Sequence, residues 1–174
     1  MPLSLHAAFV PSALQMLGAT RKLVDRAESW CGEQGCGHDT LVGARLADDM
    51  FAFDYQVKSV AVHTQGAIEG VREGVFSPDM SVPPATFEAM RTRLDEAAGA
   101  LESVGVDEME SWIGRPMRFV MGERSMDFAA EEFLLSFSQP NFYFHAATAY
   151  DILRMTGLPL GKRDFMGRLR IKRD

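Results

Sequence analysis

Apolar residues recur at spacings of three and four over most of this sequence, and this periodicity predicts a chain built mainly of helices. The first stripe covers residues 4–31. Pro11 lies inside it and removes one backbone donor, so we expect a kink near Ala7–Pro11 rather than a break. The glycines that follow are expected to end this helix, and they are Gly32, Gly35 and Gly37.

Two further stripes predict a second and a third helix. The second covers 46–71, about 26 residues or roughly 39 Å of helix, and is expected to form the longest and most regular helix of the chain. Asp39 is a candidate N-cap ahead of it, and Gly74 is expected to stop it. The third stripe covers 86–104 and ends before Gly105.

After the third stripe the pattern changes from a helical period to strict alternation, which is typical of strands. Gly122-Glu123 stands at the centre, and glycine first in a two-residue loop is typical of a type II′ hairpin turn. Such a turn fixes three cross-strand pairs, which are Phe119 with Met126, Met117 with Phe128 and Arg118 with Asp127. We therefore predict a short β-hairpin, which needs packing against the helices for stability.

The last helical region covers residues 129–156 and is rich in aromatic side chains. Pro140 is expected to kink or divide it, and its apolar character on most sides predicts cover from more than one neighbour. The tail from Leu160 is expected to be extended. Four long helices, with the hairpin on a long connection between the third and the fourth, predict a mostly α four-helix bundle that forms a single domain over 1–174.

The bulk composition limits the classes of partner. A net charge of −6 disfavours binding to the phosphates of nucleic acids. Basic residues gather only between Lys162 and Lys172, where a solvated chain end explains them. No stretch approaches the roughly 18 to 20 apolar residues of a membrane span, and the first residues lack the pattern of a signal peptide. We therefore expect a cytoplasmic protein that binds neither nucleic acid nor membrane.

Two cysteines, Cys31 and Cys36, lie in a glycine-rich segment with His38 close behind. Three ligand-type side chains at this spacing suggest a metal site, but a structural zinc site takes four ligands and the sequence holds no second pair. A disulfide is the other alternative. Two unpaired thiols in a loop are the simplest interpretation.

Nucleotide-binding and nucleophile motifs are absent from the sequence, so attention falls on histidines within predicted helices. His145 follows Asn141 by one turn, so their side chains share a face, and His63 flanks the stripe of the second helix. Helix bundles build metal sites from such inward side chains. A core histidine or asparagine more often satisfies local hydrogen bonds, which we expect for Asn141 and His145. Asp49 and Gln56 precede His63 at seven-residue intervals and are expected to form a solvated seam.

Two motifs carry a resemblance to a known family. The first is Ala44-Arg45-Leu46-Ala47-Asp48-Asp49-Met50-Phe51, with Gln56-Val57 after it. The second is Gln139-Pro140-Asn141-Phe142-Tyr143-Phe144-His145, followed by Gly157-Leu158-Pro159-Leu160-Gly161-Lys162-Arg163-Asp164-Phe165. Together they resemble a bacterial family of unknown function within the DinB/YfiT-like superfamily of metalloenzymes, over essentially the whole chain. The resemblance implies a four-helix bundle, commonly dimeric, with a metal site between its helices.

In that superfamily the resemblance implies three histidine ligands, one on the second helix and an H-x-x-x-H pair on the fourth. The pair falls here on Asn141 and His145, and His63 is the candidate on the second helix. Zinc and nickel are typically held by imidazole, and an amide is a weaker ligand. One interpretation is a metal-free homodimer whose aromatic fourth helix lines a small-molecule pocket. The other is a zinc- or nickel-dependent enzyme of the thiol-transferase or isomerase type; the residues favour the first and name no substrate.

Overall fold

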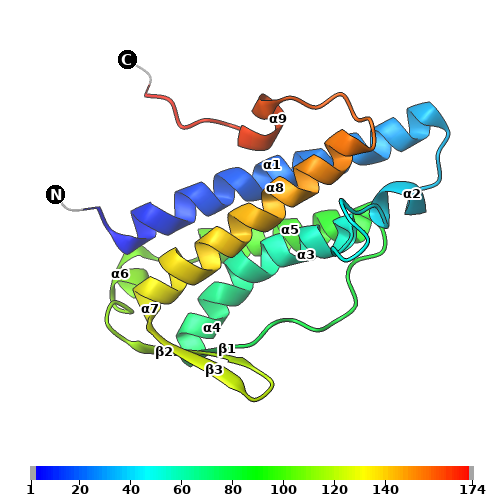
Figure 1. Ribbon diagram of the computed structural model, residues 1–174. Coiled ribbons are helices and arrows are strands. Elements are labelled where there is room, and N and C mark those ends of the chain that lie inside the picture. The colour runs from blue at the N-terminus through cyan, green and yellow to red at the C-terminus, as the bar shows by residue number, and fades with distance from the viewer. Residues whose placement is uncertain (1–2, 173–174) are drawn as a thin grey trace.

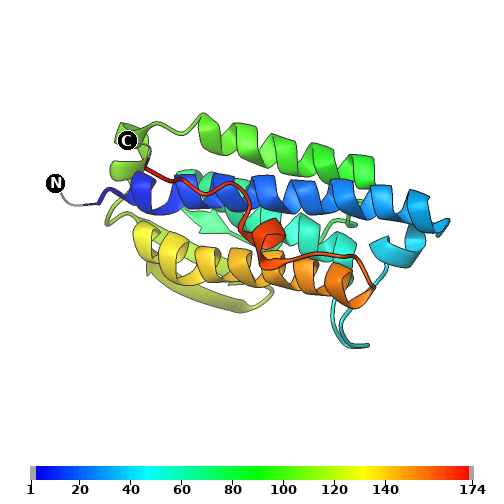
Figure 2. The same cartoon turned by 90° about the horizontal axis from the view of Figure 1, so that it is seen from above.

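Four long helical segments lie side by side in the computed structural model, which describes residues 3–172 (Figure 1). They are α1 (Leu5–Gln34), α3 with the π-helical turn η1 and α4 (Phe53–Ala61, Val62–Gly66, Ala67–Glu73), α5 (Phe87–Glu102), and α7 with the π-helical turn η2 and α8 (Ala130–Glu132, Phe133–Ser138, Gln139–Met155). Both α1 and α3 pack against α5 and α8, so α5 and α8 occupy diagonal positions of the bundle (Figure 2). The predicted four-helix bundle is confirmed, and the diagonal explains why the connection between its last two helices is long.

The core is filled by large aromatic side chains, and each long segment contributes at least one. Five phenylalanines are at most 2% exposed, namely Phe9, Phe53, Phe87, Phe133 and Phe142. Truncating a buried phenylalanine to alanine typically costs about 3 to 5 kcal/mol, so each of these rings holds a large share of the stability of the fold. Among residues 3–172 no helix is long and apolar enough to cross a membrane.

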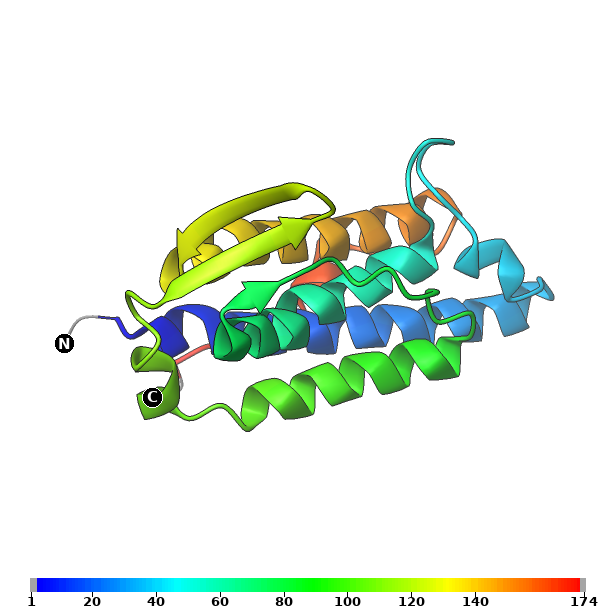
Figure 3. The same ribbon diagram turned by 90° about the horizontal axis from the view of Figure 1, so that it is seen from below.

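A three-stranded sheet covers one end of the bundle, beside α4 and α7 (Figure 3). Its hairpin joins β2 (Pro116–Met121) to β3 (Arg124–Ala129) with the predicted register, in which Phe119 pairs with Met126 and Arg118 with Asp127. Gly122 has a φ of 59°, as the first position of a type II′ turn requires. The sheet also contains β1 (Val75–Phe76), which pairs in parallel with β2. Two residues are too few to show an alternating pattern, so the sequence did not predict this strand.

The second helix begins later than predicted. Residues 44–52 form turns, in which Phe53 N–H donates to the Ala44 carbonyl, and the helix starts at Phe53. The apolar stripe continued into this segment by coincidence, because its first members there are not buried: Leu46 is 36% exposed and Met50 is half-buried. Asp39 does not cap this helix either. It is the first residue of the separate short helix α2 (Asp39–Val42).

The first helix ends later than predicted. It continues unbroken through Pro11 and past Gly32, and it stops where Gly35 adopts a left-handed φ of 64°. Cys31 therefore lies in the helix, 1% exposed, and the interpretation of both thiols as loop residues was wrong. With 30 residues, α1 is also longer than the segment predicted to be the longest.

Two short helices were not predicted. One is α6 (Val106–Glu110), between α5 and the hairpin. The other is α9 (Lys162–Met166), in the tail that we expected to be extended. The Asp164 carboxylate accepts a hydrogen bond from Gly161 N–H at the start of α9 and pairs with Arg26 of α1. These contacts fold the tail back onto α1.

Candidate functional site

The two π-helical turns meet inside the bundle, and this is where His63 lies. His63 belongs to η1, and Ser138, the last residue of η2, contacts it. In η1 the Thr64 hydroxyl donates to the carbonyls of Val60 and Ala61. π-Helical turns are rare, and those that occur are often found at functional sites. Two of them in contact therefore identify this part of the bundle as a candidate site.

Pro140 gives a physical reason for η2. A proline inside a helix has no N–H, and its ring clashes with the carbonyl four residues earlier. The wider turn over Phe133–Ser138 lies directly before Pro140, which is among the first residues of α8. The helix therefore passes through Pro140 undivided, and the expected interruption takes the form of a π-helical turn.

The hydrogen bonds of Gln56 fix the protonation of His145. Gln56 is 2% exposed, and its Nε2 donates to the Phe51 carbonyl at 2.9 Å. Its Oε1 therefore faces His145 Nδ1, at 2.7 Å. Because this oxygen only accepts, Nδ1 carries the imidazole proton and Nε2 keeps its lone pair.

Ser138 orients His63 in the same way. Its hydroxyl donates to the His63 carbonyl at 2.9 Å and lies 3.4 Å from His63 Nδ1. With its proton on that carbonyl, the hydroxyl oxygen offers Nδ1 an acceptor, which favours the tautomer that leaves a lone pair on Nε2 of His63. Within residues 3–172 no hydrogen bond uses Nε2 of either ring, and no buried side-chain nitrogen or oxygen lacks a partner. Each Nε2 is therefore accessible to a ligand or to water.

Both imidazoles are neutral near pH 7. Burial lowers the pKa of His145 to about 4, and burial together with the neighbouring His145 lowers the pKa of His63 to about 4. The two rings are nearly parallel, with centroids 5.7 Å apart. Aromatic rings surround them, with Phe76 and Phe137 beside His63 and Tyr55 and Phe144 beside His145. The result is a pair of hydrogen-bond acceptors in a mainly aromatic environment.

Asn141 turns back to its own helix, where its Nδ2 donates to the Phe137 carbonyl at 2.7 Å. The prediction that Asn141 and His145 hydrogen-bond within the protein is confirmed. In the described part of the chain, no three His, Cys, Asp or Glu side chains lie close enough together to hold a metal. The predicted ligand set of His145, Asn141 and His63 thus contains two imidazoles that lie together and one amide whose nitrogen is engaged elsewhere.

Sequence reasoning misjudged two of the residues that shape this site. The predicted solvated seam was wrong, because Gln56 is buried against His145 while Asp49 is exposed in the turns of 44–52. A glutamine placed between Phe53 and Val57, both buried, is the signal that marked it. Ser138 was missed, and a serine in an aromatic stretch offers no comparable signal.

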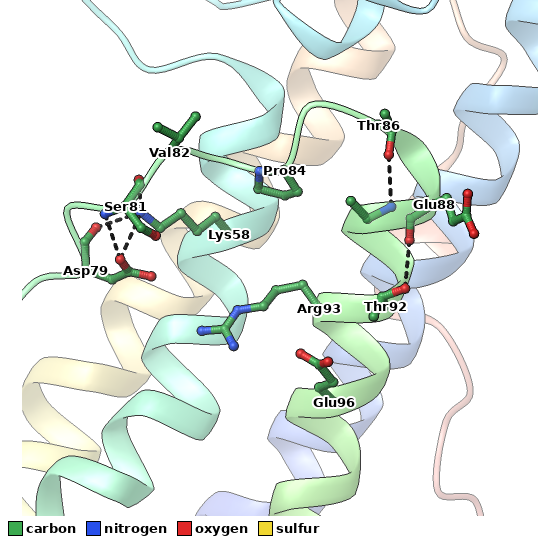
Figure 4. Close-up of a pocket in the computed structure, with 11 residues that line it drawn as sticks. Lys58, Asp79, Ser81, Val82, Pro84, Thr86, Glu88, Thr92, Arg93 and Glu96 are labelled. Carbon is green, nitrogen blue, oxygen red and sulfur yellow. Dashed lines mark hydrogen bonds and ion pairs between the residues drawn. The ribbon is translucent and has the colours of Figure 1, made fainter.

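A groove of about 640 Å³ lies elsewhere, between α3 and α5 (Figure 4). At its side the buried Lys58 donates to the carbonyls of Asp79 and Ser81 and pairs with the Asp79 carboxylate. These contacts use the three donors of the ammonium group, so Lys58 holds the loop before α5 in place and has no donor left for a ligand. The groove also carries Arg93 and Glu96 on α5, so its charge is mixed.

Comparisons with known proteins place this chain in a family. A comparison with curated proteins gave no match. The crystal structure of a DinB family member protein from Shewanella denitrificans superposes with a TM-score of 0.81, over 98% of this chain and 96% of that chain, at 24% sequence identity. At this identity the likeness shows a shared fold. The family model for a domain of unknown function (DUF1993) matches residues 5–166. The chain therefore belongs to the DUF1993 family, and it shares its fold with a DinB family member.

Proposed function

We propose that this protein binds a small, mainly aromatic molecule carrying an O–H or N–H donor, at His63 and His145. The observation that carries the proposal is the pair of Nδ1 contacts, which favours an acceptor at Nε2 of each ring, on two rings whose centroids are 5.7 Å apart. The proposal places the ligand against the aromatic fourth helical region, through Phe137 and Phe144.

The lowered pKa values support binding rather than proton transfer. A general base works best when its pKa lies near the working pH, and both imidazoles have a pKa of about 4. At neutral pH they accept hydrogen bonds but take up protons poorly. Two uncharged acceptors also disfavour carboxylates and phosphates, so the proposed ligand is neutral.

Three matched probes test this proposal, namely phenol, toluene and benzoate. Phenol offers an aromatic ring and a donor, toluene only the ring, and benzoate the ring with an anion. We expect phenol to shift the ¹⁵N resonances of both Nε2 atoms and to raise Tm with concentration. At a concentration about 100 times Kd the stabilisation is about 2.7 kcal/mol, or roughly 5 to 10 °C for a chain of this size.

The variants His63→Gln and His145→Gln should each weaken the phenol response, whereas His6→Gln, the same exchange near the start of α1, should leave it intact. Equal responses to toluene and phenol would show that the donor is irrelevant. A stronger response to benzoate would show that the site is cationic, and no response to any probe would exclude this ligand class. Each of these three results overturns the proposal.

A divalent metal is the second candidate, and the contact between Gln56 and His145 favours it. Metal-bound histidines usually donate their other ring nitrogen to an oxygen acceptor, as His145 Nδ1 does. However, a catalytic zinc site takes three protein ligands, and among residues 3–172 no third His, Cys, Asp or Glu joins the two imidazoles. The set does not fit zinc or nickel fully, and the thiol-transferase or isomerase alternative depends on Asn141 supplying the third ligand through its oxygen. Calorimetric titration with zinc, compared between the wild type and His145→Ala, separates this candidate from the first.

We also propose that the chain forms a homodimer through exposed apolar side chains of α8. Tyr143, Phe144 and Met155 are exposed on this helix. Phe51, which stacks on Tyr55 of α3, is also exposed. Aromatic side chains and methionine are enriched at protein interfaces. The resemblance to commonly dimeric proteins supports the same state.

A further inference from the structure

The two cysteines face each other across the C-terminal end of α1. Cys31 Sγ and Cys36 Sγ are 2.9 Å apart, whereas a disulfide bond measures about 2.05 Å. Cys31 is buried in the last turns of the helix, and Cys36 is half-buried just beyond the Gly35 cap. The sulfur atoms therefore need to approach by less than about 1 Å to bond.

The backbone already holds the pair in place. Cys36 N–H donates to the Cys31 carbonyl at 3.1 Å, which closes the helix around the left-handed Gly35. The Cys36 thiol points at Cys31 Sγ, and the Cys31 thiol points at the Gly37 carbonyl, 3.8 Å away. The two sulfur atoms are thus already in contact across a turn that the backbone closes.

We propose that Cys31 and Cys36 are a site of reversible oxidation, at which a low-molecular-weight disulfide such as oxidised glutathione converts them to an intrachain disulfide. The site lies apart from the histidine pair, and the proposal is independent of what that pair binds. It reverses the expectation of two unpaired thiols.

The reaction proceeds by two exchanges. The Cys36 thiolate attacks one sulfur of oxidised glutathione, forming a mixed disulfide and releasing one glutathione thiolate. Cys31 sulfur then loses its proton to that thiolate or to water and attacks Cys36 sulfur, releasing the second glutathione. Two protein thiols are oxidised, and one oxidised glutathione is reduced to two molecules of glutathione.

The different surroundings of the two thiols set this order. Burial, and then the neighbouring Cys36, raise the pKa of the Cys31 thiol to about 12. A buried thiol in its protonated form reacts poorly with reagents in solution. Cys36 is the more accessible partner, so it meets the oxidant first, and Cys31 reacts only with the sulfur next to it.

Oxidation is expected to stabilise the far end of the bundle. The bond closes a loop of six residues, 31–36. His38 follows this loop closely, and its ring contacts Phe87 at the start of α5. Chain-entropy arguments for a loop this short predict a rise in Tm of roughly 4 to 9 °C in a chain of this size.

The test incubates the reduced full-length protein with oxidised glutathione and follows its intact mass, its titratable thiols and its Tm. We expect the mass to fall by two hydrogens, both thiols to disappear, and Tm to rise, all reversed by dithiothreitol. Cys36→Ser should show none of these changes, and its remaining Cys31 should resist iodoacetamide until the protein is unfolded.

Three results would overturn the proposal. One is the persistence of both thiols in excess oxidant, and another is a glutathione adduct that stays on Cys36. The third is a disulfide-linked dimer on a non-reducing gel. Each would mean that the two sulfur atoms of one chain do not reach bonding distance.

Discussion

Replacing Gln56 by leucine tests the hydrogen bond on which the tautomer of His145 depends. Leucine fills a similar volume but offers no acceptor, so His145 Nδ1–H loses its partner at 2.7 Å. An unsatisfied buried polar group costs about 1 to 3 kcal/mol, which we expect as the loss in free energy of unfolding. The Phe51 carbonyl, the other partner of Gln56, belongs to a residue that is 61% exposed, so water can replace its donor.

The interaction is isolated by a double-mutant cycle with His145→Leu. That single variant orphans Gln56 Oε1 and should cost a similar amount, but the double variant removes both polar partners at once. We therefore expect the double variant to be more stable than the sum of the single losses predicts, by about 1 to 3 kcal/mol. Urea unfolding at pH 7.5, where both imidazoles are neutral, measures all four proteins at a common m-value.

Gln65→Leu provides the matched control, because Gln65 lies on the same helical segment and bonds to the exposed Glu69. It should cost less than about 0.5 kcal/mol and combine additively with His145→Leu. An additive cycle for Gln56 and His145, within about 0.5 kcal/mol, would mean that the bond is not formed. The lone pair on His145 Nε2, and with it the proposed binding mode, would then have no basis.

Three further predictions concern the same molecule. The pKa of both imidazoles is lowered from 6.5 to about 4, so the unfolded chain binds protons first as pH falls. The contribution of the two rings to the free energy of unfolding is full above about pH 6.5 and is lost toward pH 4, by about 1 kcal/mol per ring between pH 7 and 5.5. In urea titrations, His145→Gln should halve this dependence on pH. Elemental analysis of protein purified without an affinity tag should give zinc and nickel below about 0.2 per chain, and Asn141→His should raise the affinity for zinc. Near-stoichiometric metal that is lost in His145→Ala would instead favour the metal-dependent enzyme. Light scattering at micromolar concentration should give twice the chain mass of 19.3 kDa, and a monomer throughout would exclude self-association.

Local signals predicted some elements of this fold accurately. The hairpin register followed from one turn and the alternation around it, because a glycine that leads a two-residue loop leaves a single pairing for its flanks. The third helix was also found within two residues of its ends, since Thr86 caps it with its own hydroxyl. In both cases the determining contacts lie within a few residues along the chain.

The site depended on contacts between distant segments, and sequence reasoning could not supply them. The flanking Phe53 and Val57 could have marked Gln56 as buried, but nothing near it in the sequence identifies His145, 89 residues away, as its partner. The same holds for Ser138 and His63, which are 75 residues apart. The periodicity of the sequence predicted that His63 and His145 lie on helices, but only the packing of those helices brings the two rings together.

The hairpin sets the chemistry of the site although it contributes no polar group to it. Its Phe119 and Phe128 pack on Phe137, and Phe137 packs against the ring of His63. This aromatic cluster excludes water from one side of His63, and burial is the main reason that its pKa falls. A short hairpin needs such packing for its own stability, so the same rings hold the sheet on the bundle and keep the imidazole neutral. Aromatic residues of the fourth helical region, which the sequence suggested as the lining of a pocket, thus belong to the core. By burying His63 and His145 they keep both imidazoles uncharged, as hydrogen-bond acceptors.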